Sequence, residues 1–164
     1  MIEIVYKIDN NKNLHALLNS FEEIQKNLNI KLFIVGENKL NSVSKRILEM
    51  KNVKRINFIS SRAKLSRIYK ESHLLCLPSK KETFGLVCIE ALSQGIPFLM
   101  RKNQGIDGLL EVSEKMFFEN DNQLTTRILE IIKDYNSVND VKIDFNQFKL
   151  NNISPRMISN YREW

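Results

Sequence analysis

Several residue types are scarce in this sequence, and each scarcity excludes a class of protein. Two cysteines in 164 residues cannot make a disulfide scaffold, and both Cys76 and Cys88 lie in apolar runs, where a free thiol behaves as a small hydrophobic side chain. Five glycines and three prolines exclude collagen-like and low-complexity chains. No apolar run approaches the roughly 20 residues that cross a bilayer, and nothing at the start predicts a secretory signal. The expected compartment is the cytoplasm.

What is present suits one globular domain with an uneven charge. With 43% hydrophobic residues, a chain of this length can bury a core. The net charge is +6, and ten basic residues but only one acid, Glu49, lie within residues 39–70. Such a field attracts the phosphates of nucleotides, nucleic acids or lipid headgroups without choosing among them. Alternatively, these basic residues lie on solvent-exposed faces of helices and bind no partner.

The hydrophobic spacing predicts alternating strands and helices. Apolar runs predict strands over residues 2–6, 31–36, 53–60, 73–78, 96–100 and 116–118. Apolar residues three or four positions apart predict helices over residues 13–28, 42–51, 62–71, 86–94 and 124–135. Ser154-Pro155 is typical of the start of a last helix. Continuously apolar strands favour parallel pairing, so we expect one α/β domain over residues 1–164, a doubly wound, Rossmann-like parallel sheet with helices on both faces.

The segment from Pro78 to Pro97 carries the most chemistry, because ligands of doubly wound sheets bind beyond the carboxyl ends of strands. A strand ends at Pro78, and a helix begins near Gly85. The N-terminus of that helix favours an anion, which free backbone amides would bind at Phe84, Gly85 and Leu86. Glu82 and Glu90 flank the place, and carboxylates accept hydrogen bonds from sugar hydroxyls. The arrangement predicts a nucleotide-sugar site, although each glutamate alone could be an ordinary surface residue.

The same segment resembles the signature of the retaining glycosyltransferases of family 4, the glycosyl transferases group 1, which have the GT-B fold. It matches the pattern P-S-x-x-E-x-F-G-x4-E-A-x3-G-x-P, in which Glu82 and Glu90 form the E-x7-E pair. Residues 5–14, VYKIDNNKNL, resemble the family's V-G-R-L-x3-K-N-L, and residues 31–36 resemble the strand that follows it. The resemblance extends over about residues 4–118.

The resemblance implies a role for each matching residue. Glu82 and Lys12 are the catalytic candidates. The donor diphosphate would be bound by Lys7, Lys12 and the amides of Phe84, Gly85 and Leu86. The transferred sugar would be bound by Glu82, Thr83 and Phe84, and the ribose hydroxyls by Glu90. These groups would stabilise the charge of the departing nucleotide diphosphate, and we expect no metal or other cofactor because the sequence has no D-x-D motif.

Three positions depart from the family pattern. Lys7 stands in place of an arginine, which keeps the charge but not the bidentate geometry. Tyr6 stands in place of a glycine, and His73 where an aspartate is common. In the loop after Met100, Glu111 matches a later family glutamate.

Family members have two Rossmann-like domains, and this chain resembles only the C-terminal, donor-binding one. We therefore expect an excised or separately encoded half that is inactive without an N-terminal acceptor domain. The expected helix over residues 154–164 would cross to that absent domain.

Three classes of function remain open. The first is the donor-binding part of a hexosyltransferase that moves a sugar from a UDP- or GDP-linked donor, with retention, to a glycan or lipid-linked acceptor in bacterial polysaccharide or capsule biosynthesis. The second is a non-catalytic module that binds nucleotide diphosphates or sugar phosphates. The third, nucleic-acid binding, is disfavoured because the few aromatic residues lie on faces predicted to be buried.

Two further expectations concern the remaining polar and charged residues. The basic residues of 39–70 could hold the chain peripherally at the anionic inner face of the plasma membrane. His15, His73 and the two cysteines lack metal-ligand spacing, so we expect structural roles for them.

Overall fold

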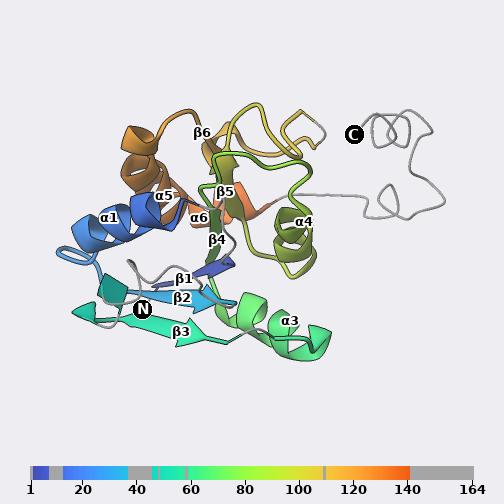
Figure 1. Ribbon diagram of the computed structural model, residues 1–164. Helices are drawn as coiled ribbons and strands as arrows, with labels where there is room; N and C mark the ends of the chain where they lie inside the picture. The colour runs from blue at the N-terminus through green and yellow to red at the C-terminus, as the bar shows by residue number, and fades with distance from the viewer. Residues whose placement is uncertain are drawn as a thin grey trace.

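The apolar runs form a six-stranded parallel sheet between two layers of helices in the computed structural model (Figure 1). The structure describes residues 2–7, 13–36, 46–47, 49–57, 59–108 and 110–140, with the backbone alone at residues 5–7. The strands are β1 (Ile2–Lys7), β2 (Ile30–Val35), β3 (Val53–Ile56), β4 (Leu74–Leu77), β5 (Phe98–Arg101) and β6 (Phe117–Phe118). The α-helices are α1 (Leu14–Ile24), α3 (Arg62–Glu71), α4 (Leu86–Ser93), α5 (Leu124–Lys133) and α6 (Tyr135–Asn139). Two short 3-10 helices are η1 (Glu114–Met116) and η2 (Asp121–Gln123).

The strand order is β3-β2-β1-β4-β5-β6, and all five pairings are parallel. β1 therefore lies inside the sheet, with β2 on one side and β4 on the other. The predicted doubly wound, Rossmann-like sheet is confirmed. Because the strands are parallel, their carboxyl ends share one edge, where the loops into the helices meet.

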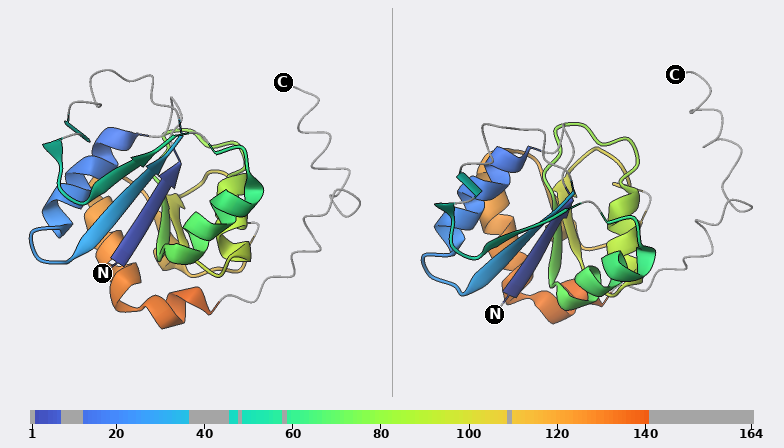
Figure 2. Two further views of the ribbon diagram at one scale, coloured as in Figure 1. Left: turned by 90° about the horizontal axis from the view of Figure 1, so that it is seen from below. Right: turned by 60° about the horizontal axis from the view of Figure 1, so that its bottom comes forward.

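Helices cover both faces of the sheet, as Figure 2 shows: α1 and α5 lie together on one side, and α3 and α4 lie on the other. The predicted apolar stripe of α1 is buried against the sheet, at Leu14, Leu17, Leu18, Phe21 and Ile24. α5 contributes Leu124, Ile128 and Ile131 to the same core. Each such side chain stabilises the fold by about 1.5–3 kcal/mol relative to leaving it exposed.

Three predicted elements end earlier than expected. α1 ends at Ile24 rather than at residue 28, where turns at the polar residues 25–27 replace the helix. β3 ends at Ile56 because β2, its neighbour among the described strands, ends opposite it at Val35. α5 ends at Lys133, and Tyr135 begins the separate helix α6.

Two predicted helices fall partly or wholly outside the described residues. Residues 46, 47 and 49 are helical, but residues 42–45 and 48 lie outside the described residues, as do all of residues 154–164, so the extent of the first helix and the whole of the second stay predictions. In the part that is described, no helix has the length and apolar character needed to cross a membrane.

Candidate functional site

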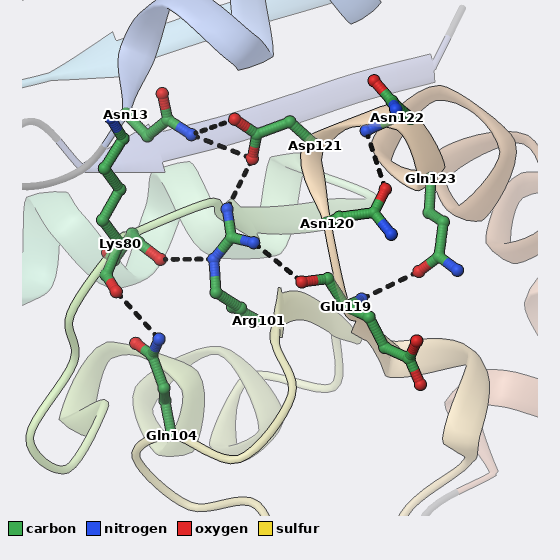
Figure 3. Close-up of polar contacts among 10 residues, drawn as sticks. Asn13, Lys80, Arg101, Gln104, Glu119, Asn120, Asp121, Asn122 and Gln123 are labelled. Carbon is green, nitrogen blue, oxygen red and sulfur yellow. Dashed lines mark hydrogen bonds and ion pairs between the residues drawn. The ribbon is translucent and has the colours of Figure 1, made fainter.

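The predicted site lies in the loop between β4 and α4, and the segment after β5 holds this loop in place. Three donors from residues 101–105 bind three backbone carbonyls of the loop, and Figure 3 shows the contacts of Arg101 and Gln104. Arg101 Nε donates to the Ser79 carbonyl oxygen at 3.2 Å, and Gln104 Nε2 donates to that of Lys80 at 2.8 Å. The Gly105 amide donates to the carbonyl oxygen of Glu82 at 3.1 Å. The loop is therefore fixed along its length rather than only at its ends.

Gly105 allows the two loops to approach closely. Its φ is +57°, in the left-handed region that favours glycine. A Cβ atom there would lie 2.9 Å from the Phe84 carbonyl oxygen and 2.8 Å from Met100 Cε. No real side chain fits at these distances without moving the Phe84 backbone, so the shape of the β4–α4 loop depends on this glycine.

The N-terminus of α4 is built by Gly85 and Glu82. Gly85 caps the helix with φ 78° and ψ 40°, and Leu86 is its first helical residue. The Gly85 amide donates to Glu82 Oε1 at 3.2 Å, so the Glu82 carboxylate lies at the helix N-terminus, where the macrodipole favours negative charge. The structure thus brings together the predicted sugar-binding carboxylate and one of the predicted anion-binding amides.

The other predicted loop residues differ in exposure. Thr83 is exposed, and Phe84 is half-buried and packs against the core. Leu86 is 63% exposed, which is unusual for a leucine at the start of a largely buried helix. Leu86 and Glu90 lie four residues apart in α4, so they share a face of the helix.

Glu90 borders a cavity of about 450 Å³ between α3 and α4. The cavity is lined by Arg62, Leu65, Ser66, Tyr69, Glu90, Ser93 and Gln94. Tyr69 is 2% exposed, and its hydroxyl donates to Glu90 Oε2 at 3.3 Å. Burial raises the pKa of Tyr69 well above its usual range, and the neighbouring Glu90 charge raises it further, so the hydroxyl stays a donor. Across the cavity Ser66 Oγ donates to Gln94 Oε1.

The two predicted diphosphate-binding lysines cannot be placed in the same way. Lys7 ends β1 at the carboxyl edge of the sheet, but its side chain lies outside the described residues, as does all of Lys12. Asn13, the next residue, is described and belongs to the same edge. The roles of both lysines stay predictions.

Sequence reasoning missed a polar cluster at this edge, formed by Asn13, Arg101 and Asp121 (Figure 3). Asp121 accepts hydrogen bonds from Asn13 Nδ2 at 3.0 Å and from Arg101 Nη2. The sequence offers one signal for it: Arg101 directly follows a buried strand, at the edge where the ligand was expected. Tyr69 lies within the helix predicted over residues 62–71, and its hydroxyl contact with Glu90 has no sequence signal.

The structural roles expected for His73 and the two cysteines fit the geometry, whereas the role expected for His15 stays a prediction. His73 Nδ1 accepts a hydrogen bond from the Glu3 amide at 3.3 Å, and its ring lies 5.9 Å from that of Tyr135. Cys76 and Cys88 are both buried. His15 is exposed on α1, and Glu111 is exposed in the loop after β5. Among the residues that the structure describes, no group of three or more His, Cys, Asp or Glu could hold a metal ion.

Comparison with known proteins identifies relatives of the sequence. The family profile described as "Glycosyl transferases group 1" matches residues 2–144. An uncharacterized glycosyltransferase, MJ1607, from Methanocaldococcus jannaschii is 22% identical over 177 residues. That match covers 99% of this chain but 44% of MJ1607, so the chain spans less than half the length of this relative.

Solved glycosyltransferase structures share the fold. The C-terminal domain of the glycosyl transferase group 1 family protein LpcC from Francisella tularensis superposes with a TM-score of 0.73 at 16% identity, covering 91% of this chain and 87% of that domain. Anabaena HepE, solved in complex with UDP-glucose, has a TM-score of 0.77 at 17% identity, covering 99% of this chain and 49% of HepE. The six-stranded sheet is therefore the fold of a C-terminal, Rossmann-like GT-B domain.

Proposed function

The chain belongs to the glycosyl transferases group 1 family, and from this premise we propose that it is the donor-binding part of a retaining glycosyltransferase of family 4. It would take a sugar from a UDP- or GDP-linked donor and pass it to a glycan or lipid-linked acceptor in bacterial polysaccharide biosynthesis. One observation carries the proposal. The two signature carboxylates occupy different places around α4, Glu82 at the helix N-terminus and Glu90 beside a cavity of about 450 Å³, a volume in the range of small-molecule sites.

We propose that the donor displaces Glu82 from the Gly85 amide. A sugar or diphosphate oxygen would then accept from the N-terminus of α4, and the released carboxylate would accept from hydroxyls of the transferred sugar. When the bond to the sugar breaks, negative charge grows on the departing diphosphate. The helix N-terminus, together with Lys7 and Lys12, would stabilise that charge while the acceptor attacks from the same face.

We propose that the ribose binds at the cavity between α3 and α4. The Tyr69 hydroxyl donates to Oε2 of Glu90 and fixes the carboxylate at the cavity wall. A carboxylate held in this way can accept from vicinal ribose hydroxyls in a charge-assisted pair of bonds. Arg62 and Gln94 line the same cavity and could contact the base.

Calorimetric titration of the 164-residue chain tests the donor site. UDP or GDP should bind, and a mixed oligonucleotide should not. Glu90→Ala should weaken nucleotide binding by about 1–3 kcal/mol, the loss of a charge-assisted pair of hydrogen bonds. Glu71→Ala, which removes an exposed acid at the end of α3, is the matched control and should bind as the wild type does. Equal affinity of Glu90→Ala and wild type would remove Glu90 from the site.

Substitution of Glu82 should affect the binding of free nucleotide and of nucleotide-sugar differently. We expect Glu82→Ala to change the affinity for UDP or GDP little and to weaken the binding of the matching nucleotide-sugar, because its carboxylate is assigned to the sugar. Equal losses for both ligands would contradict this role. A panel of nucleotide-sugars in the same titration would identify the base and the sugar.

No metal is needed in this proposal, because Lys7, Lys12 and the amides at the N-terminus of α4 would stabilise the charge of the diphosphate. Nucleotide affinity measured in EDTA should therefore equal that measured in added Mg²⁺ or Mn²⁺. A strong rise with either ion would contradict the assignment of charge stabilisation to the lysines and the helix N-terminus.

A non-catalytic nucleotide-diphosphate or sugar-phosphate binding module is the second candidate. It is favoured by the fact that every placed site residue is assigned to the donor and none to an acceptor. The two candidates differ in turnover. We expect the 164-residue chain alone to bind nucleotide-sugar without transfer, and transfer to appear only with an acceptor-binding domain.

We also propose that the chain works in the cytoplasm, where its basic face contacts an anionic membrane surface. Exposed cations on and near β3 and α3 are Lys51, Lys54, Arg55, Arg62, Lys64, Arg67 and Lys70, and among the described residues none of them forms an ion pair. Each could contribute about 1 kcal/mol near an anionic surface. Vesicles with phosphatidylglycerol should retain the chain at low salt, and vesicles of phosphatidylcholine alone should not.

A further inference from the structure

The cluster of Asn13, Arg101 and Asp121 joins three loops at the carboxyl edge of the sheet. Asn13 precedes α1 at the exit of β1, Arg101 ends β5, and Asp121 begins η2 after β6. Through Arg101 the cluster also reaches the β4–α4 loop at Ser79 (Figure 3). It therefore connects the segment that contains Lys12 to the segment that contains Glu82.

Asn13 uses its side chain for this cluster instead of capping its own helix. An asparagine at the N-cap normally accepts a hydrogen bond from an amide of the first turn, worth about 1 kcal/mol. Here the Asn13 side chain makes no cap bond, and its backbone has φ 46° and ψ 46°. Nδ2 instead donates to both carboxylate oxygens of Asp121, each at 3.0 Å, across 108 residues of sequence.

Arg101 satisfies three acceptors in different directions. Nε donates to the Ser79 carbonyl oxygen, Nη1 to that of Glu119 at 2.9 Å, and Nη2 to Asp121 Oδ1 at 2.5 Å. Its guanidinium also lies over the Phe118 ring, 4.9 Å from the ring centre. The side chain is 18% exposed, so most of its surface is used in these contacts. A lysine could not bind three acceptors with one planar group.

The negative charge of the Asp121 carboxylate is compensated by its partners within the cluster. Partial burial raises its pKa, but the hydrogen bonds from Asn13 and Arg101 and the Arg101 charge outweigh this, so its pKa lies below the usual range. Asp121 is thus ionised and paired at neutral pH, and its charge is compensated at an edge where a phosphate is expected.

We infer that Arg101 and Asp121 are positioning residues, which hold the Asn13 turn and the Ser79 carbonyl at a fixed separation so that the two phosphate-binding segments face one donor diphosphate. This inference rests on the proposed function. The cluster does not touch the diphosphate itself. It sets the distance between Asn13, which follows Lys12 in the sequence, and the N-terminus of α4, six residues beyond Ser79. Misplacing either segment by about 1 Å would cost binding or rate without removing a single ligand contact.

Three variants of the 164-residue chain test the inference, with UDP and GDP as probes. Asn13→Gly removes only the side chain, because glycine adopts φ 46° without strain. Asp121→Asn removes the charge, and Arg101→Lys keeps the charge but not the fork of donors. Arg127→Lys is the matched control, since Arg127 pairs with Glu130 on α5 through one Nη1 at 2.7 Å.

We expect each of the three variants to lower nucleotide affinity roughly tenfold and the control less than twofold. Hydrogen exchange should become faster in peptides that cover residues 13–17 and 79–85. The urea midpoint of Asn13→Gly should lie close to that of the wild type. A loss of affinity in this variant would then reflect the position of the site residues and not a loss of folded protein.

The outcomes separate this inference from the proposed function. Wild-type binding with unchanged affinity in Asn13→Gly and Arg101→Lys overturns the inference and leaves the proposed function standing. If the nucleotide affinity of the variants falls only in proportion to their loss of unfolding free energy, the cluster has a purely structural role, and this result also overturns the inference. A wild type that binds neither UDP nor GDP refutes both.

Discussion

Replacing Gly105 by alanine gives a sharp test of how the β4–α4 loop is held. The left-handed backbone at φ +57° costs an alanine about 1–2 kcal/mol. The new Cβ would also lie 2.9 Å from the Phe84 carbonyl oxygen, and such overpacking costs about 1–3 kcal/mol. The lower entropy of the unfolded alanine chain returns about 0.4–1 kcal/mol. We therefore expect Gly105→Ala to lower the free energy of unfolding by about 2–4 kcal/mol.

Gly108 provides the matched control in the same loop. Its φ is +77°, but a Cβ there would meet nothing within 4 Å. Gly108→Ala should thus show the backbone cost alone, about 1 kcal/mol. Urea unfolding followed by circular dichroism measures both, and the difference between them is the cost of the close contacts with Phe84 and Met100.

The same pair of variants links stability to binding. If Gly105→Ala displaces the Phe84 carbonyl, the neighbouring Gly85 amide moves with it, so UDP or GDP affinity should fall in Gly105→Ala and not in Gly108→Ala. Equal unfolding free energies for the two variants would refute the idea that close approach to Phe84 shapes the loop.

Three other variants or treatments have definite expected results. Tyr69→Phe should make the free energy of unfolding fall less steeply above pH 10. In the wild type the tyrosine of the unfolded chain ionises there while that of the folded chain stays protonated, which lowers the free energy of unfolding by about 1.4 kcal/mol per pH unit. Urea unfolding at a series of alkaline pH values measures this slope. Ser79→Ala should leave the urea midpoint unchanged or raise the free energy of unfolding by up to about 1 kcal/mol, because the buried Ser79 hydroxyl has no partner in the described part of the chain; a loss of stability would contradict this. Neither Cys76 nor Cys88 should react with Ellman's reagent until urea unfolds the chain, since both are buried and burial raises the pKa of the Cys76 thiol; rapid labelling of the native chain would be the contrary result.

The fold could be predicted from the sequence because its signals are local. Continuously apolar strands and a stripe such as that of α1 record which faces are buried, and parallel pairing follows from them. The ends of elements were less predictable, because they depend on partners. β3, for example, ends where β2 stops pairing with it, and nothing within residues 53–60 indicates that point.

The candidate site was only partly predictable for a similar reason. The signature placed Glu82 and Glu90 around α4, as the structure has them, because both belong to one continuous segment. The bond from the Gly85 amide to Glu82 depends on a side-chain conformation, which no spacing encodes. The contacts of Arg101 with Asp121 and Ser79 join residues that only the strand order brings together.

The order of the strands also has a consequence for how the chain folds. Of the six described strands, β1 is synthesised first, yet it lies in the interior of the sheet, and it cannot gain its second neighbour until β4 has been synthesised about 70 residues later. Since every pairing among the described strands is parallel, no tight hairpin between them can nucleate the sheet. Folding should therefore take milliseconds or longer rather than microseconds, and β1 should acquire protection from exchange late, together with β4.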